Sequence, residues 1–161
     1  LSEMEESFGI KRHPERLKNQ GKDLFAGIGA TRLSQHLIKT EQIPGMVITL
    51  DTTPLFKGEP GIALYSKHWE KNDLIPTPEL IAATTEIETF LQAQEPDLRL
   101  ANNTNDYLNY GKFLNQDRAQ PVPCIAIEPS IYPYHQKDER VFLKDIQRTE
   151  ELVKALLLEQ R

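Results

Sequence analysis

Short apolar runs alternate with longer amphipathic stretches along most of the chain, and the two patterns predict different elements. Residues 47–50 are uncharged and rich in β-favouring side chains, which suit a strand buried in a sheet. Similar runs predict strands at 61–66, 98–101 and 123–127. Proline, glycine or polar residues flank these runs, as is typical of strand ends.

The longest amphipathic stretch predicts a helix over residues 78–94. Thr77 suits the capping position before it, and Pro78 suits the first helical position. Because apolar residues recur there at helical spacing, one side of the helix is expected to be buried. That side would consist of Leu80, Ala83, Ile87, Phe90 and Leu91.

Further helices are expected at 107–114 and 145–160, and another ends near Lys39. A glycine-rich entry at 27–30 precedes this last one, but no strand comes before it and the third glycine of the dinucleotide fingerprint is missing. Close packing of the helix start is therefore favoured over phosphate binding. The expected apolar faces are Leu33, Leu37 and Ile38 for the helix ending at Lys39, and Ile146, Leu152, Val153, Leu156 and Leu157 for the helix at 145–160.

Strands and helices alternate along the sequence, which predicts an α/β fold with a mixed, largely parallel sheet. The short connection between the strands at 47–50 and 61–66 allows those two to run antiparallel. The chain has 161 residues, enough for a single domain with a hydrophobic core. We expect residues 1–161 to form one domain or the C-terminal portion of a larger catalytic domain.

Charge and cysteine content narrow the function classes. The formal net charge is −5 with acids and bases interspersed, so no basic stripe indicates a nucleic-acid partner. No run approaches the ~20 apolar residues of a membrane span. The one cysteine, Cys124, excludes an intrachain disulfide and suits a reducing compartment. We therefore expect a cytoplasmic protein with neither nucleic acid nor membrane as a partner.

Asp51 follows the strand at 47–50 directly, and Thr52 and Thr53 end that strand. Ligands of open α/β sheets bind in the crevice beyond the carboxyl ends of the strands. A carboxylate at that place is a candidate metal ligand or acid/base group. The alternative is an aspartate that only caps the following turn.

Two further candidates lie in turn-rich segments. Glu5 and Glu6 form an adjacent pair before the turn at Gly9. His135 lies in the segment 128–136, which we expect to be irregular because of its two prolines. The other histidines are weaker candidates: His13 and His68 are expected to be exposed, and His36 to be a surface or boundary residue.

Carboxylates and an imidazole are ligands that suit zinc. In an adjacent acidic pair, one carboxylate can bind the metal while the other acts as general base toward a water molecule. Spacing alone only suggests such a site.

The ordered set of motifs resembles the C-terminal half of a co-catalytic di-zinc aminopeptidase, nearest to the glutamyl and deblocking aminopeptidases. Members of that family have a Glu-Glu pair, a Gly-Ala helix start, a strand that ends in Asp, a Gly-Thr-Asp-like loop and a final Tyr-x-His loop. The matching residues are Glu5 to Gly9, Gly29 and Ala30, Val47 to Asp51, Thr104 to Asp106, Tyr132 to His135, Glu139, and Asp145 with Ile146.

The resemblance implies a three-layer αβα sandwich of the zinc exopeptidase type and a metallopeptidase that hydrolyses peptide or amide bonds. Glu5 would be the general base. Glu6 and His135 would bind one zinc ion, and Asp51 would bind the other. Assembly into homo-oligomers is a further expectation from these relatives.

The sequence departs from the family pattern in three places. The family's first histidine ligand and its bridging aspartate lie upstream of the Glu-Glu pair, and this chain, which begins at Leu1, has no such segment. Residues 11–25 form a longer connection than expected, and Asn105 interrupts the Gly-Thr-Asp-like loop. We therefore expect an upstream segment of the same enzyme to supply the two missing ligands, and the isolated chain to be inactive.

Two other functions are compatible with these residues. A catalytically inactive relative would keep the fold for small-ligand binding or assembly. A phosphohydrolase with Asp51 as nucleophile would need a second acid two residues later, where Thr53 stands.

Overall fold

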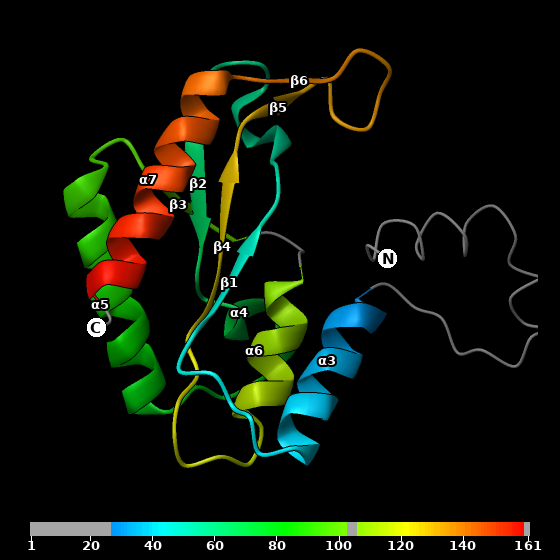
Figure 1. Cartoon of the computed structure of the whole chain (residues 1–161), viewed down its shortest axis with the longest axis vertical. Helices are drawn as coiled ribbons and strands as arrows, with labels where there is room; N and C mark the ends of the chain where they lie inside the picture. Colours follow the sequence, from blue (N-terminus) through cyan, green and yellow to red (C-terminus); the bar gives the residue numbers. More distant parts are fainter. Residues whose placement is uncertain (1–26, 103–105, 160–161) are drawn as a thin grey trace, which may run out of the picture. The chain divides into compact units, whose positions relative to one another are not determined.

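The computed structural model describes residues 27–102 and 106–159 (Figure 1). The chain divides into two compact units, residues 1–43 and 44–161. Two of the predicted site residues, Glu5 and Glu6, lie outside the described residues.

The first unit contributes helix α3 (Ile28–Lys39), which starts after Gly27 at a φ of 80°. Its predicted apolar face was wrong, because Leu33 and Ile38 are 46% and 36% exposed. Small and hydroxyl side chains are buried instead, including Thr31 and Ser34. These two hydroxyls donate hydrogen bonds to carbonyls one turn earlier, at 2.9 and 2.8 Å, and this makes their burial inexpensive.

The second unit is built on a four-stranded mixed sheet in the order β1-β4-β2-β3. The pairs β1–β4 and β2–β3 are parallel, and β4–β2 is antiparallel. The predicted α/β class with a mixed, largely parallel sheet is thus confirmed. β1 and β2 do run in opposite directions, but β4 lies between them. The strands are β1 (Val47–Leu50), β2 (Ile62–Tyr65), β3 (Arg99–Ala101) and β4 (Cys124–Pro129).

Helices α5 (Pro78–Gln94) and α7 (Leu143–Glu159) pack on one face of the sheet, and α6 (Tyr107–Asn115) packs on the other (Figure 1). Alternate residues of a strand point to opposite faces, so β2 and β4 supply side chains to both cores. The α5/α7 side buries Ile62, Leu64, Ile87, Leu91, Leu98, Ile125, Ile127, Leu152 and Leu156. The α6 side buries Ala63, Tyr65, Tyr107, Leu108 and Ala126.

Helix α5 starts as the sequence predicts: the Thr77 hydroxyl accepts a hydrogen bond from the backbone N–H of Leu80 at 3.2 Å. For α7 the expected face is only partly right. Ile146 and Leu157 are 45% and 53% exposed. Asp145 and Thr149 are buried alongside Leu152 and Leu156.

The segment after residue 127 was expected to be irregular, and this was wrong in part. β4 continues to Pro129, and β5 (Ile131–Tyr132) pairs with β6 (Arg140–Val141). The prolines lie at the ends of these strands, where a missing N–H removes no hydrogen bond from inside the ladder. Two short helical turns, η1 (Pro54–Phe56) and α4 (Trp69–Asn72), also lie in stretches expected to be loops.

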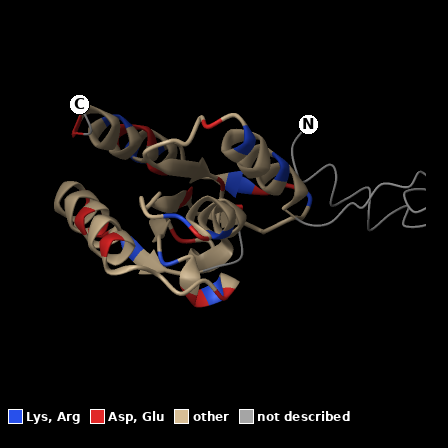
Figure 2. Ribbon diagram, turned by 90° about the horizontal axis from the view of Figure 1, so that it is seen from below, with Lys and Arg blue, Asp and Glu red and all other residues tan. Residues whose placement is uncertain are grey.

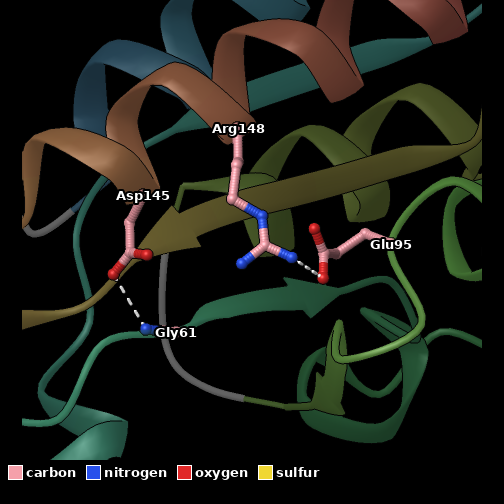
Figure 3. Close-up of polar contacts among 4 residues, drawn as sticks. All are labelled: Gly61, Glu95, Asp145 and Arg148. Carbon is pink, nitrogen blue, oxygen red and sulfur yellow. Dashed lines mark hydrogen bonds and ion pairs between the residues drawn. The ribbon is translucent and has the colours of Figure 1, made fainter.

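Two buried carboxylates fasten α7 to the rest of the second unit (Figure 3). Asp145 accepts a hydrogen bond from the backbone N–H of Gly61 at 2.8 Å. Glu95, just after α5, forms an ion pair with Arg148. Both carboxylates are therefore partnered, as buried acids must be to offset the cost of desolvation.

Charged residues of both signs are interspersed along the described ribbon (Figure 2). On α7 an exposed ion pair joins Lys154 to Glu150 at 2.6 Å. None of the described helices has the length and apolar content needed to cross a membrane.

Candidate functional site

The parallel strands β1 and β4 end side by side, and Asp51 follows β1 at this edge. Leu50 is in register with Ile127, and the pairing resumes at Thr53 and Ser130. The Thr53 N–H donates to the carbonyl of Pro129 at 3.0 Å, which keeps the two segments together beyond Asp51. Asp51 is exposed at the carboxyl end of this strand pair, where ligands of α/β sheets bind.

The loop after β5 carries the second predicted residue, His135. The imidazole stacks on the ring of Tyr134, with 3.8 Å between ring centroids and an interplanar angle of 20°. The backbone of His135 has a φ of 55°, and its N–H donates to a carboxylate oxygen of Glu139 at 3.1 Å. Glu139 therefore stabilises an unusual backbone conformation that presents the ring pair.

The side chain of Tyr134, in this loop, interacts electrostatically with Asp51. Partial burial raises the pKa of its phenol, and the negative charges of Asp51, Glu128 and Glu139 raise it further. Such an effect requires Asp51 to lie near the tyrosine, because exposed charges are screened over distance. Asp51 and the loop that carries His135 are thus brought to the same end of the sheet.

Other predicted ligands are not part of this arrangement. Glu5 and Glu6 lie outside the described residues, as do Thr104 and Asn105. Asp106 is at the start of α6, after β3. Because β3 runs opposite to β1, the chain leaves β3 at the other end of the sheet from Asp51. Across residues 27–102 and 106–159, no three histidine, cysteine or acidic side chains gather in a group suited to a metal ion.

Glu128 also lies at this end of the sheet, and the sequence analysis did not predict it as a site residue. This glutamate is 2% exposed and belongs to β4. The register of β1 and β4 sets it opposite Asp51, the residue after β1. A signal was available, since Glu128 follows an apolar strand just as Asp51 does, and the same strand-exit argument applies to both.

An apolar groove of about 660 Å³ adjoins Asp51 on the α7 side. Leu50, which is 61% exposed, forms part of its wall. A few charged side chains, with Asp51 among them, thus border a largely apolar surface, a combination typical of small-molecule sites. The remaining lining residues are Thr52, Pro129, Ile146, Thr149, Glu150, Val153 and Lys154.

The expectation that His68 is exposed was wrong. It is fully buried at the start of α4, and its Nδ1 lies 3.0 Å from the side-chain nitrogen of Asn72. Burial lowers its pKa to about 4, although the hydrogen bond with Asn72 opposes that shift. Gly111 of α6 leaves the space that the ring occupies. His68 is therefore a packing residue, whereas His36 is exposed as predicted.

Comparison of the chain with protein-family models, with curated proteins and with solved structures finds no match.

Proposed function

We propose that this chain supplies part of the site of a zinc metallo-exopeptidase, an aminopeptidase-like enzyme that hydrolyses peptide or amide bonds. The observation that supports the proposal is the position of His135, which stacks on Tyr134 in the loop that follows β5, beyond the bridge of Thr53 and Ser130 that joins the Asp51 segment to the end of β4. Asp51 and the loop of His135, far apart in sequence, thus lie toward the same end of the sheet, where the resemblance would place metal ligands.

Two of the proposed ligands have side chains of the kind that zinc binds in proteins. Asp51 offers an exposed carboxylate, and His135 offers an exposed imidazole whose backbone is fixed by Glu139. In this proposal Asp51 and His135 each bind zinc, and Glu6 is a further ligand. When bound, zinc acts as a Lewis acid and lowers the pKa of a coordinated water molecule.

Glu5 is assigned as the residue of this chain that transfers a proton during hydrolysis. As general base it would accept the proton from the attacking water and pass it to the leaving amine. An upstream segment would supply a histidine and a bridging aspartate to complete a two-zinc site. The α5/α7 and α6 sides of the sheet would be the outer layers of an αβα sandwich of the zinc exopeptidase type.

The test is the zinc content of the natural full-length protein, measured by elemental analysis after gentle purification. About two zinc ions per chain are expected. Asp51→Asn and His135→Gln should each reduce zinc occupancy and the hydrolysis of aminoacyl-p-nitroanilides. His36→Gln, which changes an exposed histidine of α3, should leave both unchanged.

Two outcomes would overturn parts of this proposal. A folded protein that takes up no zinc when zinc is supplied would exclude the metallopeptidase. Hydrolysis by the isolated 161-residue chain above a metal-only control would exclude the incomplete site.

A second candidate is a catalytically inactive relative that binds a small apolar ligand. The groove of about 660 Å³ beside Leu50 favours it, because this groove is largely apolar and open to solvent. Full folding, no zinc and saturable binding of an apolar ligand that Leu50→Ser abolishes would favour this function over the peptidase.

A further inference from the structure

A separate cavity of about 440 Å³ lies at the strand pair β5–β6. Its walls include two aromatic side chains that remain in contact with solvent: Tyr132 is 54% exposed and Phe142 is 40% exposed. Large aromatic side chains left open around one concave site are typical of ligand-binding surfaces. Gly58, Pro133, Arg140 and Val141 complete the lining.

Arg140 is the charged member of this lining. It is opposite Tyr132 in the register of β5 and β6, so guanidinium and phenol belong to the same strand pair. Within the part of the chain that the structure describes, the Arg140 guanidinium takes part in no hydrogen bond or ion pair. Its five N–H donors are therefore available to a ligand.

The aromatic wall is supported by the backbone beneath it. Gly58 has a φ of 97°, and a Cβ at this residue would lie 3.3 Å from Cγ of Tyr132. The Tyr132 ring thus packs directly against a turn that favours glycine. Part of the cavity is consequently formed before any ligand binds, which lowers the entropic cost of binding.

We propose that this cavity binds a carboxylate carried on an apolar body, with Arg140 as the recognition residue. A planar guanidinium matches a carboxylate with two parallel hydrogen bonds, and the aromatic walls cover the apolar part. A phosphate dianion is less suited, because Asp138 and Glu139 precede Arg140 and add negative charge.

Tyr132 and Pro133 lead directly into the loop of Tyr134 and His135. For that reason the natural carboxylate is assigned to the free C-terminus of a short peptide. This assignment to a peptide rests on the proposed function, whereas recognition of the carboxylate does not.

The binding test uses the 161-residue chain, labelled with ¹⁵N, and two probes: N-acetyl-phenylalanine and N-acetyl-phenylalaninamide. We expect saturable shifts of the Tyr132, Val141 and Phe142 amide signals with the acid and none with the amide. Arg140→Gln should weaken binding of the acid at least tenfold. Lys137→Gln, which removes a neighbouring exposed cation, should leave binding unchanged.

Three results would overturn the proposal: equal binding of acid and amide, unchanged binding by Arg140→Gln, or tighter binding of phenyl phosphate than of the acid. Arg140 is exposed, so its variant is expected to keep the fold, and Gly58→Ala gives an independent test. That change strains the turn under Tyr132 and should weaken binding of the acid.

A second measurement separates this inference from the proposed peptidase. In the natural full-length protein, Arg140→Gln should raise KM for a tripeptide with a free carboxylate and leave KM for its C-terminal amide unchanged. Carboxylate binding in a protein that lacks zinc would uphold the cavity and exclude the peptidase. An active zinc enzyme whose KM does not depend on the terminal carboxylate would exclude the peptide assignment.

Discussion

The carboxylate of Asp145 accepts a hydrogen bond from the backbone N–H of Gly61 at 2.8 Å and ties the first turn of α7 to the start of β2 (Figure 3). Asp145 is 1% exposed and Gly61 is half-buried, so the acceptor of this bond is shielded from water. The two residues are 84 positions apart, and neither alone indicates the contact.

Removal of this carboxylate should destabilise the second unit. In Asp145→Ala the half-buried Gly61 N–H loses its acceptor, which costs about 1–3 kcal/mol. Urea denaturation followed by circular dichroism measures the free energy of unfolding. Glu151→Ala, an exposed acid on the same helix, serves as the control and should change it by less than ~0.5 kcal/mol. Equal effects of the two substitutions would contradict the role of Asp145.

Gly111 should tolerate no side chain, because a Cβ there would overlap the ring of His68. Alanine favours helices more than glycine does, so an open helical site would gain stability. Here overpacking should dominate, and Gly111→Ala should lower the free energy of unfolding by about 1–3 kcal/mol.

The double variant Gly111→Ala/His68→Ala tests that cause. The removal of the ring makes room for the methyl group, so Gly111→Ala should cost less in the His68→Ala background. Gly45→Ala is a matched control, because a Cβ there meets nothing within 4 Å. Additive effects of the two changes would show that the overlap is not the cause.

The free energy of unfolding should decrease in mild acid, because the buried His68 has a lowered pKa. Burial lowers its pKa from 6.5 to about 4, so between these values the unfolded chain binds a proton that the folded chain excludes. The stabilising contribution is complete above pH 6.5 and is lost as the pH falls toward 4, by about 3 kcal/mol in total.

Urea denaturation at several pH values between 4 and 7.5 measures this loss. The His68→Gln variant lacks this imidazole, so its free energy of unfolding should depend less on pH over that range. If the two proteins show the same pH dependence, other groups are responsible for it.

The phenol of Tyr134 reports on the candidate site without any metal. The charge of Asp51 is one of the causes that raise its pKa, so Asp51→Asn should lower that pKa. Titration of a ¹³C-labelled tyrosine by NMR measures the change. Asp138→Asn is the control, since Asp138 lies in the same loop but is not among the charges acting on Tyr134. No difference between the two variants would mean that Asp51 and this loop are farther apart than proposed.

Elements whose signals are local could be predicted from the amino-acid sequence alone. Strand β1 and the start of α5 at Thr77 and Pro78 follow from side chains within a few residues of each other. Asp51 was identified in the same way, since a strand and its exit are adjacent in sequence. Periodicity also identified Leu80, Ile87 and Leu91, because these apolar residues repeat at the spacing of one helix face.

Contacts between segments that are distant in sequence could not be predicted and are known only from the folded chain. β4 lies between β1 and β2, and this order brings Asp51 to the loop of Tyr134 and His135. Burial of His68 depends on the space at Gly111, which comes from another helix. The physical reason is that strand order and the burial of polar groups depend on partners far away in sequence, whereas helix caps and strand propensities depend on neighbours.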